Sequence, residues 1–382
     1  MNRFSILLAT PPLLLLGSVS VVAHGFGSPT PGADLQIPDT AAMQQDVDYT
    51  DHFRVFTGEG EPASLADIVR AMAAVDVVLV GENHTDPVGH WIEAELLREA
   101  LTAAEAGEES AVVRPVALSL EMFERDVQGI VDEYLQDFIT EKQFKADARP
   151  WEYYDADYRS MVELAKEAGM PVIAANAPRR YVSRVTRLGR DAVNALPSYA
   201  QSFLPPLPYP EPSEAYRAEW LALMAEMPME RQCIPPAGEA AVQSDTLVAE
   251  HEVEQPSHPA AETPPAGPPA HMGAFLENGL RAQTLWDASM AHAITTYLET
   301  SPGALVLHMV GGFHVENFTG IPEKVQHYRP GIRSLVVSMD NADDFRSFDP
   351  DEHTGRGDFV ILTDKSLNLE YARYCVEEEG AG

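Results

Sequence analysis

The chain has few cysteines, few basic residues and, beyond its first residues, no long apolar run. It contains no Cys-x-x-Cys pair, which excludes the common cysteine motif of metal sites and covalent c-type haem attachment. The two cysteines, Cys233 and Cys375, could pair in an oxidising compartment or remain free, and the sequence leaves both states open. Lys and Arg number 26 against 59 Asp and Glu, a formal net charge of −33, which disfavours nucleic acids and anionic membranes as partners.

The first 23 residues have the pattern of a secretory signal peptide. Arg3 is the only charge before an apolar stretch that ends in small residues at Val21-Val22-Ala23. Two prolines near the middle of this stretch argue against an uninterrupted membrane helix, and no cysteine follows it for lipid attachment. We therefore expect an exported, periplasmic and soluble protein with no integral membrane segment after removal of residues 1–23.

The remaining chain predicts an irregular arm over 24–60 and then one α/β domain over 61–382. Apolar runs, several of them rich in β-branched residues, alternate with amphipathic segments, and this order predicts a mostly parallel sheet flanked by helices. Strands are expected at 75–80, 116–120, 171–175, 304–310, 334–338 and 359–362. A proline-rich insert at about 233–270 separates the third and fourth core strands. Its eight prolines and lack of hydrophobic periodicity predict disorder.

Two helices have the clearest patterns. One apolar face at helical spacing extends from Val127 to Phe138. A long amphipathic helix is expected over 275–298, where Gln283 and Asp287 lie one turn apart on an otherwise apolar stripe. Both residues are therefore expected on the inner face of this helix, with Leu280, Met290 and Ile294.

One short motif occurs twice, each time after an apolar strand. Val75–Val80 leads into Gly81-Glu82-Asn83-His84, and the strand at 304–310 leads into Gly311-Gly312-Phe313-His314. Glycine allows a sharp turn at the end of a strand, and in a parallel sheet the loops at these ends bind ligands. The two histidines therefore predict one site built from distant parts of the chain.

Other polar residues follow the predicted strands and join this site. Glu121 follows the second strand, and Asn176 and Arg179 follow the third. Two imidazoles with carboxylates suit a divalent metal such as Zn, Mn or Fe, with His84, His314 and Glu121 as ligands. Glu82 or Glu121 could then activate a water molecule, and without a metal the same groups could transfer protons. His308 lies inside its strand and is expected to be buried and hydrogen-bonded.

These motifs carry a family resemblance. The segments ending in His84, Glu121-Met-Phe, Asn176-Ala-Pro-Arg179 and Gly-Gly-Phe-His314 resemble the ChaN-like haem-binding family of the Tiki superfamily. The resemblance implies an exported protein of iron or haem uptake that binds haem non-covalently, or another iron-containing small molecule, as a homodimer. Relatives such as the Tiki-type proteases imply a metal-dependent hydrolase as the alternative.

The haem ligands are less defined than the strand-end residues. The resemblance implies that they lie between the third strand and the Gln283 helix, where Tyr209, Tyr216 and His271 are candidates by location. Asn176 and Arg179 are expected to contact the cofactor. A third interpretation, a scaffold with a degenerate site, predicts neither haem nor metal binding.

Overall fold

The computed structural model describes residues 48–106, 114–226 and 270–367. Strands in this part of the chain form one sheet in the order β2-β1-β8-β7-β3-β6-β4-β5. The strands from β8 to β5 pair in parallel, and β1 and β2 form an antiparallel edge. Their bounds are β1 Phe53–Thr57, β2 Pro62–Ala63, β3 Val77–Glu82, β4 Val116–Glu124, β5 Val172–Asn176, β6 Leu305–Gly311, β7 Ser334–Ala342 and β8 Phe359–Asp364.

The strands expected from the apolar runs are all present, so the mostly parallel α/β fold is confirmed. The arm expected to be irregular up to residue 60 is structured in part, because β1 lies within it and pairs with β8 along its whole length. The sequence of β1, Phe-Arg-Val-Phe-Thr, has no continuous apolar run, since a strand near the sheet edge is only partly covered.

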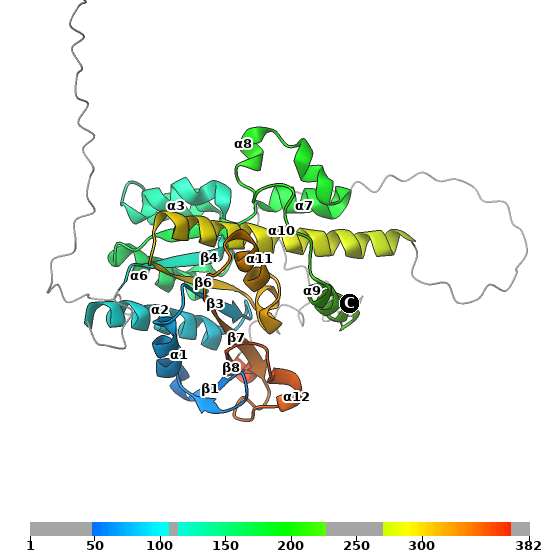
Figure 1. Cartoon of the computed structure of the whole chain (residues 1–382). Helices are drawn as coiled ribbons and strands as arrows, with labels where there is room; N and C mark the ends of the chain where they lie inside the picture. The colour runs from blue at the N-terminus through cyan, green and yellow to red at the C-terminus, as the bar shows by residue number, and fades with distance from the viewer. Residues whose placement is uncertain (1–47, 107–113, 227–269, 368–382) are drawn as a thin grey trace, which may run out of the picture. The chain divides into compact units, whose positions relative to one another are not determined.

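Helices connect the strands (Figure 1). The α-helices are α1 Leu65–Met72, α2 Pro87–Ala106, α3 Gln128–Leu135, α4 Glu141–Ala148, α5 Tyr154–Asp157, α6 Arg159–Glu167, α7 Arg179–Leu188, α8 Ser198–Gln201, α9 Glu214–Glu226, α10 Ala270–Thr300, α11 Ile321–Tyr328 and α12 Pro350–His353. Short 3₁₀ turns are η2 Tyr49–Asp51, η3 Arg125–Val127, η4 Arg190–Ala195, η5 Gly312–His314, η6 Glu316–Phe318 and η7 Lys365–Leu367.

The predicted helix over 127–138 is shorter than its apolar pattern. It begins as η3 and ends with α3 at Leu135, and Asp137 adopts a left-handed backbone with φ 58°. Phe138 is 73% exposed and does not join the apolar face. The prediction that the helix continues to Phe138 was therefore wrong, because hydrophobic spacing alone does not reveal where the backbone leaves the helical conformation.

Both faces of the central strands are covered, which explains why β3, β5 and β6 are buried along their whole length. Val78 and Val80 of β3 pack in the same core as residues of α1, α2 and α6. Val77 and Leu79 point to the other face, where their core includes residues of α10 and α11. A further core joins α7, α8 and α10. Alternate side chains of one strand thus enter two different cores.

The strand order reverses between β3 and β6. The chain leaves β3 through α2 toward β4, on the β6 side, and leaves β6 through α11 toward β7, on the β3 side. The two connections lie on opposite faces of the sheet, α2 in one core and α11 in the other. Adjacent parallel strands with this arrangement mark a topological switch point, where ligands of open α/β sheets bind. Both Gly-x-x-His loops begin here.

Several sequence predictions concern other parts of the chain. The signal peptide at 1–23, most of the arm, the insert, Cys233 and Cys375 lie outside the described residues. In the described ranges, every helix is too short or too polar to cross a membrane.

Candidate functional site

The first Gly-x-x-His loop supplies both members of an imidazole–carboxylate pair. Glu82 is the last residue of β3, and its Oε1 lies 2.8 Å from Nδ1 of His84. The His84 side chain is 45% exposed, whereas that of Glu82 is 1% exposed. The ring of Trp151 meets the imidazole edge-on, with 4.7 Å between centroids. His84 is therefore an accessible base held by a buried carboxylate.

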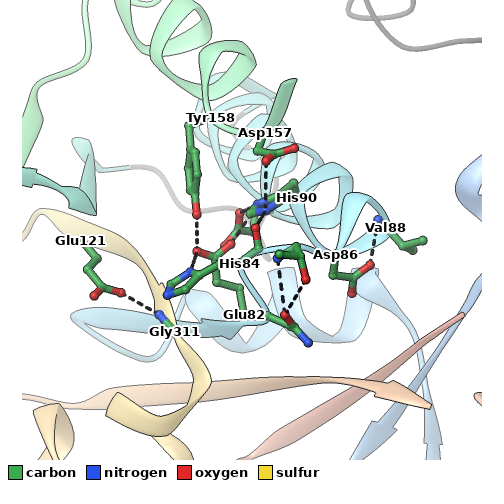
Figure 2. A network of polar contacts seen from close by, with 12 residues as sticks. Glu82, His84, Asp86, Val88, His90, Glu121, Asp157, Tyr158 and Gly311 are labelled. Atoms are coloured by element: carbon green, nitrogen blue, oxygen red, sulfur yellow. Dashed lines mark hydrogen bonds and ion pairs between the residues drawn. The ribbon is translucent and has the colours of Figure 1, made fainter. Parts of the chain in front are cut away.

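Glu82 is held by more than this one histidine (Figure 2). The hydroxyl of Tyr158 donates to Oε1 at 2.6 Å, and Nδ1 of His90 lies 2.9 Å from Oε2. Burial would raise the pKa of Glu82, but the charge of His90 and the hydrogen bond with His84 outweigh it and hold the pKa far below its usual range. Burial would lower the pKa of His84, and the Glu82 carboxylate reverses this to a net increase.

The second loop obtains its carboxylate from a distant helix. Nδ1 of His314 lies 2.5 Å from Oδ1 of Asp287 on α10, and both side chains are buried. Burial would lower the pKa of His314, but Asp287 and then Glu121 raise it to about 9. The prediction that Asp287 faces inward is therefore confirmed, and His314 is a protonated imidazole at neutral pH.

Glu121, on β4, contacts the second loop at two points. Its Oε2 accepts a hydrogen bond from the backbone N–H of Gly311 at 2.9 Å, and its Oε1 lies 3.7 Å from Nε2 of His314. A Cβ added at Gly311 would lie 3.0 Å from ring atoms of His84 and 3.7 Å from Glu121 Oε2. The glycine thus permits the close approach of the two loops. We refer to Glu82, His84, Glu121, Asp287 and His314 as the strand-end cluster.

The structure adds two residues that sequence reasoning did not place in the site. His90 and Glu93 are fully buried on α2, with 3.1 Å between His90 Nδ1 and Glu93 Oε2. Burial and the Glu82 charge raise the pKa of Glu93 to about 8. The sequence signal for this pair was a histidine and a glutamate at i and i+3, which share one helix face.

The predicted metal ligands His84, Glu121 and His314 are compared with the other potential ligands by the distances between their donor atoms. Within the described ranges, the group of potential ligands whose atoms all lie within 4.8 Å of one another is Glu82, His90 and Glu93. His84, Glu121 and His314 do not form such a group. The strand-end cluster as it stands is arranged for proton transfer, with one accessible imidazole, one buried imidazolium and a carboxylate between them.

The two predicted residues after β5 differ in exposure. Asn176 is buried, and its Oδ1 accepts no hydrogen bond. Arg179 begins α7 with an exposed side chain, and its backbone N–H donates to Glu124. His308 is buried with 2.9 Å between Nδ1 and the hydroxyl of Ser119, and burial lowers its pKa to about 3. The prediction of a hydrogen-bonded core role for His308 is confirmed.

The tyrosines proposed as haem ligands face inward. Tyr209 is buried, and its hydroxyl donates to the carbonyl of Arg281. Tyr216 is fully buried against Phe313, and burial followed by the Asp287 charge raises its pKa well above the usual value. His271 lies in the first turn of α10, but its side chain falls outside the described part of the structure.

An exposed tyrosine lies in the same connection between β5 and α10. Tyr199 on α8 is 69% exposed. Leu188, at the end of α7, is 61% exposed, although neither residue stood out in the sequence. The α7 sequence begins with Arg179-Arg180 and continues with further arginines on its polar side.

Comparison with known proteins supports the resemblance seen in the sequence. A family model described as "Haem-binding uptake, Tiki superfamily, ChaN" matches residues 68–325. The structure of ChaN of Campylobacter jejuni with cofacially bound haem is similar in fold. Its TM-score is 0.55 and its sequence identity 15%, over 83% of this chain and 99% of that one.

Two further solved structures are more distant. The type III effector HopBA1 has a TM-score of 0.38 and 13% identity, over 78% of this chain and 93% of that one. A Bacillus cereus protein has a TM-score of 0.37 and 9% identity, over 82% and 95% respectively. No curated protein matches the chain.

Proposed function

Because the chain belongs to the ChaN family of haem-binding uptake proteins in the Tiki superfamily, we propose that it binds haem non-covalently in iron uptake. The family match over residues 68–325 is the observation that carries this proposal. The signal-like pattern of residues 1–23 supports export to the periplasm as its setting. Within the described residues, an exposed surface on α7 and α8 supports a location for this ligand.

This face is exposed, basic and partly apolar. We give the name α7–α8 face to the exposed residues Arg179, Arg180, Arg187, Leu188 and Tyr199, on two helices whose buried residues share one core. Haem combines a large apolar ring with two carboxylate groups, so a binding surface needs apolar contacts beside positive charge. Of the large hydrophobic side chains exposed in the described ranges, Leu188 and Tyr199 lie on this face.

We propose Tyr199 as the iron ligand. Its phenol is exposed, whereas those of Tyr209 and Tyr216 are buried and turned inward. Tyrosinate is an established axial ligand of haem iron, and bound haem would supply that iron as a Lewis acid which lowers the pKa of the phenol. His271 remains a second candidate on the same connection.

Arginines of α7 provide charge for the two haem carboxylates. Five of the 26 basic residues of this acidic chain fall between 179 and 190. Arg180 pairs with Asp126 at 2.7 Å, and Arg190 pairs with Glu211 at 2.6 Å. Arg179 and Arg187 are exposed and form no ion pair in the described part of the chain. Arg179 thus keeps the cofactor-binding role expected from the sequence, together with Arg187.

A haem on an exposed face leaves one side of the ring open to a partner. A second copy of the chain, carrying its own haem on the same face, would cover it and bury both rings. Cofacial haem binding is the arrangement described for ChaN of C. jejuni. We therefore propose a homodimer that forms or tightens when haem binds.

A haemin titration with matched tyrosine variants tests this proposal. We expect the chain to give saturable growth of the Soret band, and Tyr199→Phe to weaken binding about 100-fold and shift the band. Tyr209→Phe and Tyr216→Phe remove the same hydroxyl from buried positions and should retain the wild-type spectrum. Absence of saturation in the wild-type chain would refute haem binding, and an unchanged spectrum in Tyr199→Phe would refute the ligand.

A second candidate function is hydrolysis at the strand-end cluster. The observation that favours it is the pairing of each imidazole with a carboxylate, with Glu121 between them. Accessible His84 would act as the base toward water, and the protonated His314 as the acid. The metal-dependent form of this hypothesis requires His84, His314 and Glu121 to close around a Zn, Mn or Fe ion.

Hydrolase activity is tested with a panel of ester and peptide substrates, each with and without added divalent metal. We expect turnover to disappear in His84→Asn and to persist in Tyr199→Phe. Turnover that survives in His84→Asn would assign the activity to a contaminant or to another site.

A further inference from the structure

The loop between β3 and α2 brings three buried ionisable groups together beside the strand-end cluster. We propose that Glu82, His90 and Glu93 bind one divalent metal ion. This site is separate from the α7–α8 face, and it does not depend on haem binding or on hydrolysis. The predicted metal set His84, Glu121 and His314 shares no residue with it.

Local structure fixes these three groups before any ligand binds. Asp86 caps α2 by accepting a hydrogen bond from the backbone N–H of Val88 at 3.0 Å, and Thr363 of β8 donates to its other oxygen at 2.6 Å. His90 and Glu93 then follow at i and i+3, one turn into the helix, facing the end of β3. In helical di-iron sites a glutamate and a histidine three residues apart, in the opposite order, supply part of the ligand set.

The distances between the donor atoms match a metal coordination shell. His90 Nδ1 lies 2.9 Å from Glu82 Oε2 and 3.1 Å from Glu93 Oε2, and one ligand atom from each residue lies within 4.8 Å of the others. Neighbouring ligands at about 2.1 Å from an ion are separated by about 3 Å. An ion at the centre would therefore need little movement of the three side chains.

The backbone selects the tautomer of His90 that binds a metal. Nε2 of His90 lies 3.2 Å from the carbonyl oxygen of His84, so Nε2 carries a proton and donates it. Without an ion, Nδ1 carries the second proton of the ring and faces the two carboxylates. A bound ion would displace this proton to solvent and take the lone pair of Nδ1. A histidine ligand whose other nitrogen donates to a carbonyl is the usual outer-shell arrangement of metal sites.

One oxygen atom in the site lacks a hydrogen-bond partner. Glu93 Oε1 is buried and accepts no hydrogen bond. Glu82 Oε2 has only His90 Nδ1 beside it, and Glu93 Oε2 faces the same nitrogen. Two carboxylates therefore face one ring nitrogen that has at most one proton to donate. A divalent cation would satisfy both carboxylates, which offsets the cost of burying them.

The composition of the site indicates which ion it takes. One imidazole with two carboxylates suits Mn²⁺, Fe²⁺ or Zn²⁺ better than the soft Cu⁺ or an all-oxygen ion such as Ca²⁺. Glu82 is already oriented by Tyr158 and His84 on its other oxygen (Figure 2). These contacts leave Oε2 for the ion and connect the site directly to the accessible imidazole.

Cobalt titration of the metal-stripped chain tests the proposal, because Co²⁺ reports a nitrogen ligand through its visible absorption. We expect saturation at one ion per chain, competition by Zn²⁺, and a loss of affinity of about 100-fold in Glu93→Gln. The matched control is Glu95→Gln, which changes the same group on α2 where it pairs with Arg98, outside the site. Haemin binding should be the same in both variants.

Three results would contradict this metal site. One is the absence of stoichiometric cobalt binding in a folded chain that still binds haemin. Another is equal affinity in Glu93→Gln and Glu95→Gln, which would indicate weak binding to the acidic surface. The third is retained binding in Glu93→Gln with loss in His314→Asn, which would place the ion in the strand-end cluster.

Discussion

The strand-end cluster and the α7–α8 face use charge in opposite ways. In the cluster, His314 and Asp287 are 7% and 0% exposed and lie 2.5 Å apart, so each depends on its partner. On the face, Arg180 is 47% exposed and Arg187 is exposed beside it. The His314–Asp287 pair of the cluster is shielded from solvent, whereas the α7–α8 face presents charged and apolar side chains to solvent.

This contrast separates stability from binding. A buried ion pair is costly to break because the remaining charge is left without solvent, whereas an exposed pair contributes little to stability. Substitutions in the cluster should therefore change the free energy of unfolding, and those on the face should change ligand affinity. The following predictions test this separation, beginning with the largest expected effect.

Asp287→Asn should produce the largest loss of stability. It leaves the His314 imidazolium buried with only Glu121 nearby, at 3.7 Å, and we expect a loss of about 3 to 5 kcal/mol in the free energy of unfolding. Urea denaturation measures this loss, and the haemin affinity of the folded variant should be unchanged. A loss below about 1 kcal/mol would mean that the pair is not charged in the folded chain.

Alkaline pH should weaken the same pair. The pKa of His314 rises from 6.5 to about 9 on folding, so its stabilisation is complete below pH 6.5 and is lost as pH rises through 9. This amounts to about 3 kcal/mol. Urea curves from pH 6 to 10 for the wild-type chain and His314→Gln measure it by difference, since Glu93 titrates in the same interval in both. If the free energies of unfolding of the wild-type chain and His314→Gln changed with pH in the same way, the assigned pKa of His314 would be contradicted.

Arg187→Glu should affect binding alone. Reversal of an exposed charge on the α7–α8 face should weaken haemin binding about 10-fold, because it repels a haem carboxylate, and should change stability by less than about 0.5 kcal/mol. Lys142→Glu makes the same exchange at an exposed position of α4 and serves as the control. If both variants weakened haemin binding equally, Arg187 would act only through the overall charge of the chain and not through a position on the α7–α8 face.

His84→Asn should have the smallest effect on stability. The ring is 45% exposed, so removal of its contact with Glu82 should cost less than about 1 kcal/mol. Urea denaturation measures the loss in the free energy of unfolding for His84→Asn and for Asp287→Asn. The two losses compare the two Gly-x-x-His loops directly. A cost similar to that of Asp287→Asn would show that exposure does not separate them.

The parts of this molecule that follow from local pattern were predictable. The parallel strands are buried on both faces, so each is a continuous apolar run, and the glycines at their ends place His84 and His314 on loops. Asp287 was also visible, as a carboxylate on an apolar helix stripe. These features depend only on periodicity and on the direction of parallel strands.

Other features depend on contacts that no short segment encodes. Tyr209 and Tyr216 lie on the expected connection, but only the packing of α10 against them decides that they are buried. Tyr199 lies on the same connection but is exposed, and this exposure is decided by the position of α8. His90 belongs to the site only because it contacts Glu82, which lies eight residues earlier on β3. In the same way, β1 forms a strand because it pairs with β8.

The most direct test of the central claim is haemin titration of the wild-type chain, Tyr199→Phe and His84→Asn, followed at the Soret band under the same conditions. We predict saturable binding with the same affinity in the wild-type chain and His84→Asn, and a shifted, weakened response in Tyr199→Phe. Loss of binding in His84→Asn with full retention in Tyr199→Phe would place haem at the strand ends and contradict the division between the two regions.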